Sequence, residues 1–142
     1  MQTFLISPNP SETAKILDSK RLGKQRIETI QILNVLLNET EKKGWRNHPA
    51  VRMWKGYEPY LVKVYLKAMI DEWEARGYNG PKCKEHYNRL YKLVESQEPE
   101  QPIWFCERFY RSHKSNLIRK KPEYYSEKFP EVPDNFPYFW PK

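Results

Sequence analysis

Apolar residues recur along most of this chain at the three- and four-residue spacing of amphipathic helices, with polar residues between them. Only five glycines are present, which leaves few sites for the tight turns of β-hairpins. A short helix is predicted from Ser11, whose hydroxyl can cap it, to Leu17, and Asp18 can cap a second, longer helix. The apolar side of that long helix is expected to comprise Leu22, Ile27, Ile30, Leu33 and Leu37.

The rest of the chain continues the helical pattern. A loop and a short helix are predicted at residues 44–59, with Pro49 at the first helical position, and a core helix at residues 60–77 that ends at Gly77. Two more helices are expected at residues 81–96 and 104–121. The last segment, residues 122–142, has five prolines and many aromatic rings, so it should pack irregularly over the core. We therefore predict an all-α fold: a single compact helical domain over residues 1–142 with a long central helix and an irregular, aromatic, Pro-rich C-terminal tail.

Composition and charge narrow the possible functions. Of the 142 residues, 15% are aromatic and 30% are charged, which is typical of a folded protein with a polar surface. No stretch approaches the roughly 20 apolar residues that span a bilayer, and the N-terminus lacks a secretory pattern, so we expect a soluble, cytoplasmic protein without membrane contact. The net charge of +7 is concentrated at residues 15–26 and 103–121, which indicates either a polyanionic partner or a solvated basic face.

The long helix carries the first candidate site. Arg21, Lys24, Gln25 and Glu28 gather on the side opposite the apolar one, and beyond Glu28 this polar side is lost. Glu28 therefore stands at a border between cations and core, where burial and the neighbouring cations push the pKa of a carboxylate in opposite directions. The alternative is an ordinary exposed ion pair between Lys24 and Glu28, which contributes only about 0.3–0.5 kcal/mol.

Two other segments combine cations with aromatic rings. In the run "WRNH" at residues 45–48, His48 is either a general acid or a hydrogen-bonding group that orders the loop. In residues 108–121, cations alternate with Phe109 and Tyr110, a combination suited to phosphates and stacked bases. The alternative is that these rings face the core and the cations face water. The cations and the histidine of this segment are Arg108, Arg111, His113, Lys114, Arg119, Lys120 and Lys121.

Cysteine and histidine give little indication of a metal site. Cys83 lies three residues before His86, and Cys106 seven before His113, but the sequence has no C-x-x-C pair. Packed thiols are therefore favoured over a zinc site. The sequence also lacks a phosphate-binding loop, a dinucleotide fingerprint and the common hydrolase signatures. We expect neither a metal nor another cofactor.

Four segments carry a resemblance to a known family: "ILDSKRLGKQRIETIQIL", "GWRNHPAVRMW", "EARGYN" and "SHKSNLIRKKPEYYSEKFPEVPDNFPYFWP". Together they resemble the pyrimidine-dimer DNA glycosylase family of endonuclease V type, in particular its cellular and viral relatives, over nearly the whole chain. The resemblance implies an all-helical single domain that kinks damaged double-stranded DNA and flips a nucleotide out of the stack. It also implies cleavage of the glycosidic bond at a cyclobutane pyrimidine dimer, followed by β-elimination at the abasic site. We expect such a protein to act as a monomer.

Carried over by position, the family mechanism gives roles to individual residues. In the family an N-terminal α-amino group forms an imine with the sugar, assisted by a glutamate that matches Glu28. Methionine is generally retained before a residue as bulky as Gln2, so the amine is expected on Met1, next to Gln2, unless lyase chemistry is absent. The alternative from another class is a non-catalytic nucleic-acid-binding protein that keeps the fold and the basic surface. The expected DNA contacts are Arg21, Lys24, Arg26, Arg46, His48, Arg111, His113, Lys114, Arg119 and Lys120.

Overall fold

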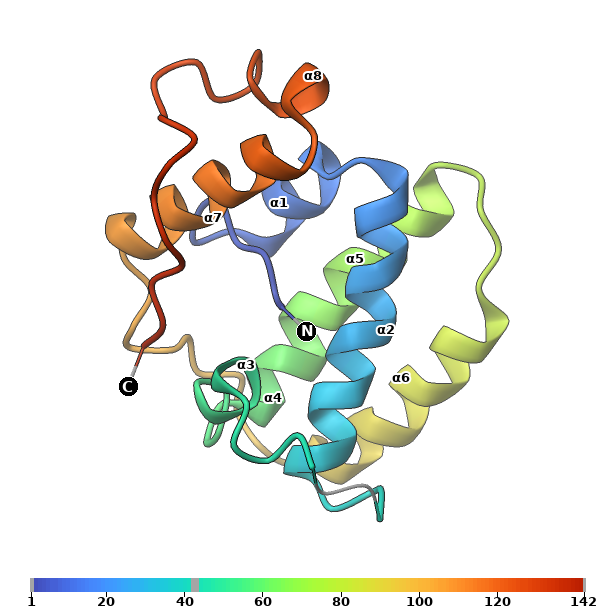
Figure 1. The fold of residues 1–142 in the computed structure, drawn as a ribbon. Coiled ribbons are helices and arrows are strands. Elements are labelled where there is room, and N and C mark those ends of the chain that lie inside the picture. The colour runs from blue at the N-terminus through green and yellow to red at the C-terminus, as the bar shows by residue number, and fades with distance from the viewer. Residues whose placement is uncertain (1, 42–43, 142) are drawn as a thin grey trace.

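The computed structural model describes residues 2–41 and 44–141, and every regular element within them is a helix (Figure 1). The prediction of an all-α single domain is confirmed. The elements are α1 (Pro10–Ile16), α2 (Ser19–Leu36), α3 (Pro49–Arg52), α4 (Glu58–Tyr60), the π-helical turn η1 (Leu61–Leu66), α5 (Lys67–Ala75), α6 (Pro81–Val94), α7 (Glu107–Lys120) and α8 (Pro122–Tyr125).

Helix α1 is capped by Asn9, so the prediction that Ser11 caps it is wrong. The Oδ1 atom of Asn9 accepts the N–H of Ser11 at 3.0 Å. Pro10 occupies the first helical position, where a missing N–H costs nothing because that group would lack an intrahelical acceptor. Ser11 thus supplies the orphan donor of this helix end, and Asn9 supplies the acceptor.

Helix α2 is the predicted long central helix, and it contacts η1, α3, α5 and α6. Leu22, Ile30 and Leu33 of its apolar side are buried as expected, but Ile27 is 50% exposed. Gln25, expected on the polar side, is 1% exposed because the N-terminal segment of the chain covers it. The buried residues of α2 are therefore not confined to its apolar side.

The predicted core helix at residues 60–77 is divided into α4, η1 and α5. The middle part, η1, has π-helical geometry. Such turns are rare in proteins, and those that occur are often found at functional sites. Tyr65 of this turn is fully buried. Helix α5 ends before Gly77, whose φ of +88° is a left-handed conformation that glycine adopts without steric cost. The predicted stop at Gly77 is confirmed.

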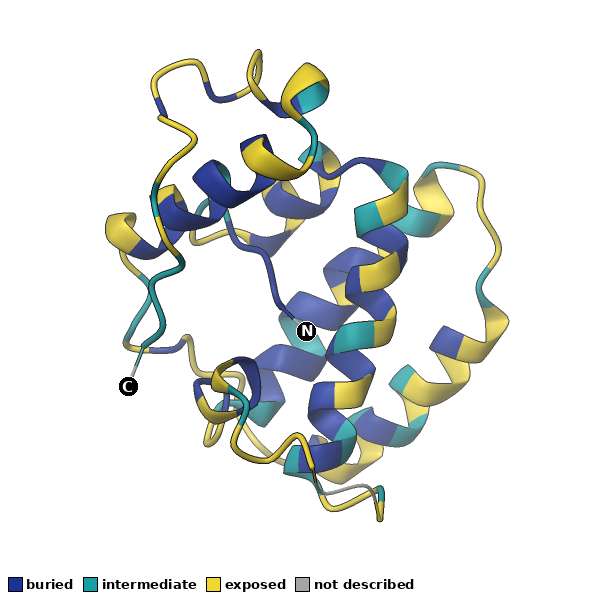
Figure 2. Cartoon of the chain, in the orientation of Figure 1, coloured by how far each residue is buried: buried dark blue, intermediate teal, exposed yellow. Residues whose placement is uncertain are grey.

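The C-terminal tail packs against α7 and the core, as predicted (Figure 1). Tyr125, Phe129 and Val132 are buried, and Figure 2 shows that the buried residues of the helices face the interior of the molecule. Helix α7 begins at Glu107 and not at Trp104, because Trp104 packs edge-to-face on Trp54 at 5.0 Å between ring centroids from an irregular segment.

None of the helices in the described part of the chain is long and apolar enough to cross a membrane. Both cysteines are free, Cys83 buried and Cys106 exposed. Within residues 2–41 and 44–141 no group of three or more His, Cys, Asp or Glu side chains is placed to hold a metal ion.

Candidate active site

The N-terminal segment, residues 2–6, enters the middle of the molecule and lies beside α2 (Figure 1). It pairs with no strand among the described residues, yet each of its five backbone N–H groups donates to a side chain. Such partners matter because an unpaired buried amide costs about 1–3 kcal/mol. The acceptors of the N–H groups of residues 2, 3, 4, 5 and 6 are, respectively, Glu28 Oε2 at 3.0 Å, Gln2 Oε1 at 2.8 Å, Gln25 Oε1 at 3.0 Å, His113 Nδ1 at 3.1 Å and Thr13 Oγ1 at 3.0 Å.

Gln25 is the central anchor of this segment. Besides accepting from Phe4, it donates from Nε2 to the carbonyl of Gln2 at 3.0 Å. The hydroxyl of Tyr65 lies 2.5 Å from Gln25 Oε1 and 2.8 Å from the carbonyl of Phe4. Sequence reasoning missed both roles, because helical periodicity places a residue on a face but does not say which distant segment covers that face.

Glu28 lies where the anchored segment approaches the surface. Its carboxylate accepts the N–H of Gln2 at 3.0 Å, and the residue is partly exposed. Lys24, one turn earlier, is exposed and makes no ion pair with Glu28, and Arg21 pairs with Asp18. The ordinary ion pair considered from the sequence is therefore not formed.

The expected amine carrier, Met1, lies outside the described residues. Gln2 is 7% exposed, and its backbone is fixed at both ends, by Glu28 through its N–H and by Gln25 through its carbonyl. The start of the described chain is thus held against the carboxylate that sequence reasoning selected.

His48 orders the loop before α3. Its Nδ1 accepts the N–H of Ala50 at 3.0 Å, and its ring lies 5.5 Å from that of Trp45 and 6.1 Å from that of Trp140. Burial lowers the pKa of His48, and the negative charge of Glu28 partly opposes this change. The ring is therefore neutral near pH 7, which agrees with the loop-ordering alternative and places His48 within the electrostatic reach of Glu28.

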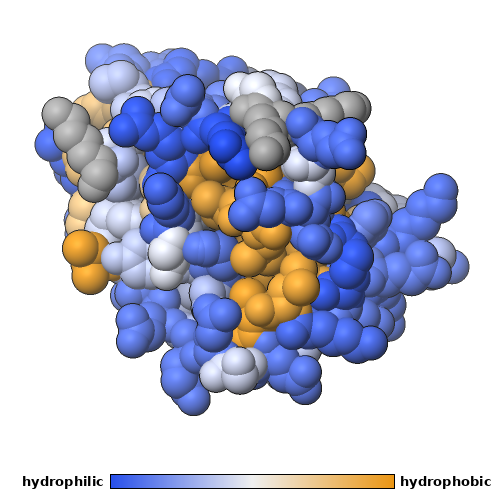
Figure 3. All heavy atoms as spheres, turned by 90° about the horizontal axis from the view of Figure 1, so that it is seen from below, coloured by the Kyte–Doolittle hydropathy of each residue, from blue (hydrophilic) through white to orange (hydrophobic). Residues whose placement is uncertain are grey.

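A basic groove adjoins this region. The underside of the molecule, where α3 and the end of α2 lie in Figure 1, carries an apolar band flanked by polar side chains (Figure 3). A groove of about 1260 Å³ is lined by residues of both elements and by Trp140 of the tail. Glu28 is not among the residues that line the groove. The groove begins at Val35, about 10 Å further along the axis of α2. The cations that line the groove are Arg46, Arg52 and Lys55.

In α7 the aromatic rings face the core and the cations face outward. Phe109 and Tyr110 are buried, which is the alternative considered for this segment. The outward cations rest partly on rings of the tail, as when the Arg108 guanidinium lies 4.5 Å from the Phe139 ring centroid. The outer surface of the helix nevertheless remains basic. Its exposed cations are Arg108, Arg111, Arg119 and Lys120, with Lys114 partly exposed.

His113 is fully buried, so the prediction that it contacts DNA is wrong. Its Nδ1 accepts the N–H of Leu5, and its ring lies 5.6 Å from that of Phe4 and 4.1 Å from that of Phe109. Burial lowers the pKa of His113 to about 3, and the ring is neutral at physiological pH. It has no charge to offer a phosphate and instead attaches the N-terminal segment to α7.

Arg26 also departs from its expected position. It is 8% exposed, and its guanidinium stacks on Trp73 of α5 at 4.0 Å. Residues two apart on a helix point to nearly opposite sides, so Arg26 lies across α2 from Glu28. Arg26 therefore does not lie beside Glu28 and Lys24, and a DNA contact by Arg26 stays a prediction.

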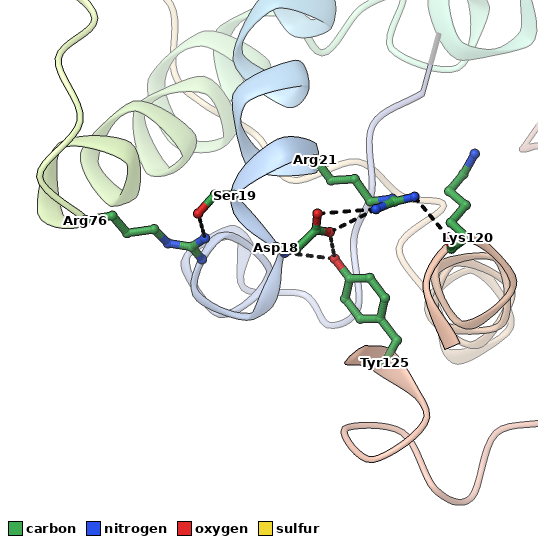
Figure 4. A network of polar contacts seen from close by, with 6 residues as sticks. All are labelled: Asp18, Ser19, Arg21, Arg76, Lys120 and Tyr125. Carbon is green, nitrogen blue, oxygen red and sulfur yellow. Dashed lines mark hydrogen bonds and ion pairs between the residues drawn. The ribbon is translucent and has the colours of Figure 1, made fainter. Parts of the chain in front are cut away.

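Asp18 and Tyr125 connect the start of α2 to the tail (Figure 4). The Tyr125 hydroxyl accepts the N–H of Asp18 at 2.9 Å and donates to its carboxylate, while Arg21 Nη1 lies 3.3 Å from that carboxylate. Burial raises the pKa of Asp18, but Tyr125 and Arg21 outweigh it and hold this pKa below its ordinary value. The Asp18 side chain therefore does not cap α2 as predicted, and Arg21, which also donates to the Lys120 carbonyl, is engaged within the protein.

A comparison with protein families shows to which family the chain belongs. The model for pyrimidine dimer DNA glycosylase matches residues 1–86. The chain belongs to the pyrimidine dimer DNA glycosylase family. In this family member, Gln25, Glu28 and Tyr65 lie within the matched part, whereas His113 and Tyr125 lie beyond it. No curated protein and no solved structure matched the chain.

Proposed function

We propose that this protein is a DNA repair enzyme that cleaves a glycosidic bond of pyrimidine dimers in double-stranded DNA and nicks the resulting abasic site with its N-terminal amine. The observation that carries the proposal is the hydrogen bond from the N–H of Gln2 to Glu28 at 3.0 Å. This bond supports it because the preceding residue, Met1, is then one peptide unit away from a partly exposed carboxylate. Family membership supports DNA as the substrate.

The proposed chemistry starts at C1′ of the damaged nucleotide. The α-amino group attacks this carbon, the glycosidic bond breaks, and the base leaves with the bonding electrons and takes up a proton. An α-amino group has an ordinary pKa of about 7.7–8.0, so far more of it is unprotonated at neutral pH than of a lysine with a pKa of about 10.4. Glu28 stabilises the cationic sugar and accepts the proton that the amine loses. The C1′–O4′ bond then breaks to form the imine, and O4′ takes up a proton. The imine acidifies the C2′ proton, and removal of this proton expels the 3′ phosphate.

The anchoring of residues 2–6 gives the amine its orientation. A terminus held beside its catalytic carboxylate avoids most of the entropy loss that a flexible terminus would suffer in the transition state. Gln25 is uncharged, and burial raises the pKa of Tyr65 well above its ordinary value, so that hydroxyl stays protonated. Gln2 is thus held by the neutral Gln25 as well as by Glu28, which leaves Glu28 as the charged partner in the proposed reaction.

The DNA is proposed to lie across the groove beside α3 and the outer surface of α7. Trp140 of the tail lines the groove, and the tail packs on α7, so the two basic surfaces adjoin. Trp45, at 47% exposed, offers a ring for an unstacked base. The protein is proposed to act as a monomer. The proposed phosphate contacts are Lys24, Arg46, Arg52, Lys55, Arg111, Lys114, Arg119 and Lys120.

A duplex oligonucleotide with one thymine dimer tests this function. The protein should cleave a glycosidic bond of the dimer, nick that strand, and leave the undamaged duplex intact. Binding to both duplexes without cleavage of either, or of an abasic duplex, would contradict the proposal and favour a non-catalytic DNA-binding protein.

A further inference from the structure

A buried arginine without a partner lies on the side of α2 opposite Glu28. Among the described residues, the Arg26 guanidinium makes no ion pair and no hydrogen bond, and its Nε is fully buried without an acceptor. Its one specific contact is the Trp73 ring, at 4.0 Å. Arg26 is only 8% exposed, and a charge so far removed from water normally has an acceptor, because desolvation without one is strongly unfavourable.

The unpartnered guanidinium lies at the N-terminus of α6. A Cβ atom on Gly80, the N-cap residue, would come within 2.6 Å of Arg26 Nη1. The guanidinium thus lies where a capping side chain would begin. Gly80 itself offers no side chain to the amides of Lys82 and Cys83, and the first turn has no acidic residue. A full positive charge therefore faces the positive end of a helix dipole.

Nearby carboxylates do not relieve this charge. Glu74 pairs with Lys84 at 2.9 Å, and Glu72 pairs with Arg76 at 2.8 Å. The other face of the Trp73 ring is occupied by Tyr78, stacked at 4.3 Å, so the guanidinium is fixed within a layered cluster. This corner, formed by Arg26, Trp73 and the N-terminus of α6, combines a rigid planar donor with free helix-end amides. No carboxylate of the described residues pairs with Arg26.

We propose that this corner binds the oxyanion of a phosphate group, held by the Arg26 guanidinium and by the amides of Lys82 and Cys83. A guanidinium donates two parallel hydrogen bonds to a phosphate, and helix N-termini bind the same group through free N–H donors. Either inorganic phosphate or a backbone phosphate of bound DNA supplies this chemistry. The site is separate from Glu28 and does not rest on the proposed catalysis.

Gly80→Asp tests the site, because its carboxylate would replace the anion at the capping position once the end of the Arg26 side chain shifts. Gly44→Asp is the matched control, since a side chain at Gly44 meets nothing within 4 Å. Thermal unfolding is compared in sodium phosphate and in sodium chloride at equal ionic strength. Phosphate should raise the melting temperature of the wild type and of Gly44→Asp by about 3 °C, and this increment should be lost in Gly80→Asp and in Arg26→Gln.

Duplex DNA binding distinguishes the two sources of phosphate. If DNA supplies the phosphate, Gly80→Asp should reduce the slope of log affinity against log salt by about 0.9 relative to Gly44→Asp. If inorganic phosphate is the ligand, the slopes should agree and only the thermal increment should differ. Equal increments and equal slopes in Gly80→Asp and Gly44→Asp would overturn the proposal. Imine trapping at the N-terminus should persist in every variant, so this failure is distinct from a failure of the proposed function.

Discussion

The N–H of Gln2 donates a hydrogen bond to Oε2 of Glu28 at 3.0 Å, across a separation of 26 residues. Gln2 belongs to the N-terminal segment, and Glu28 to the middle of the long central helix. Gln25 holds the same segment from one side and His113 from the other. The hydrogen bonds that hold this segment against the core are therefore also those that bring Gln2 to the carboxylate.

Replacement of Glu28 by Gln should abolish most base release. The substitution keeps the size of the side chain and an acceptor for Gln2, and removes the charge that stabilises the cationic sugar. Loss of such a group typically costs about 10²–10⁴-fold in rate. Single-turnover assays on a dimer-containing duplex measure this loss, with Glu39→Gln as the control because Glu39 pairs with Arg89 at the surface. Normal release in Glu28→Gln would move the role to another carboxylate, and Asp18 would be tested next.

Replacement of Gln25 by Leu should release the N-terminal segment while leaving DNA affinity within about twofold, because no DNA-facing cation changes. The side chain that accepts from Phe4 and donates to Gln2 is lost, so the amine is held less firmly. Imine formation should slow by at least about tenfold, as expected when a reactive group loses its orientation. Gln31→Leu, at an exposed position of the same helix, serves as the control. Equal imine rates in the two variants would show that the anchoring has no catalytic effect.

Acid should destabilise the protein through His113. Its folded-state pKa of about 3 lies below its ordinary value of 6.5, so between these values the unfolded chain binds a proton that the folded chain does not. The stabilisation is complete above pH 6.5 and is lost as the pH falls through this window, by about 2 kcal/mol between pH 7 and pH 5.

Urea unfolding of the wild type and of His113→Asn at both pH values measures this contribution. The variant keeps an acceptor for Leu5 but cannot be protonated, so its free energy of unfolding should fall less on acidification. His86→Asn, at an exposed histidine, should behave like the wild type. An identical pH dependence in His113→Asn would mean that His113 is accessible to protons in the folded protein.

Tyr125→Phe should destabilise the protein by about 1–3 kcal/mol, because the N–H and the carboxylate of buried Asp18 lose a shared partner. The pKa of Asp18 should also rise, since the hydroxyl helps to hold it down. Chemical denaturation measures the stability of Tyr125→Phe and of the control Tyr124→Phe. The difference between them separates this effect from the general effect of removing a tyrosine hydroxyl. Equal stabilities would show that the network in Figure 4 contributes nothing net.

The burial of individual helix residues could be predicted wherever the core covers only one side of the helix. Leu22, Ile30 and Leu33 follow this rule, and Gly77 ends its helix as its backbone freedom suggests. The prediction failed where a segment distant in sequence covers the surface. Gln25 is buried and Ile27 exposed because residues 2–6 lie along one side of α2 and leave another open.

The candidate site follows the same division. Glu28 could be selected from its place at the border between polar and apolar positions. The groups that position the chain start could not, since Tyr65 meets Gln25 across 40 residues and His113 meets Leu5 across 108. Cations are poor guides for a related reason, because Arg21 pairs with Asp18 and Arg26 is buried against Trp73, although the sequence predicts that both contact DNA.

Borohydride trapping on a duplex with a single abasic site tests the central claim most directly. The α-amino group should condense with the C1′ aldehyde with loss of water, and reduction of the imine should leave a stable protein–DNA adduct. Mass spectrometry of the digested adduct should place the DNA on the α-amino group of Met1, and acetylation of that group should prevent the adduct. An adduct on a lysine such as Lys24, or no adduct while base release continues, would contradict the claim that the chain start held by Glu28 is the nucleophile.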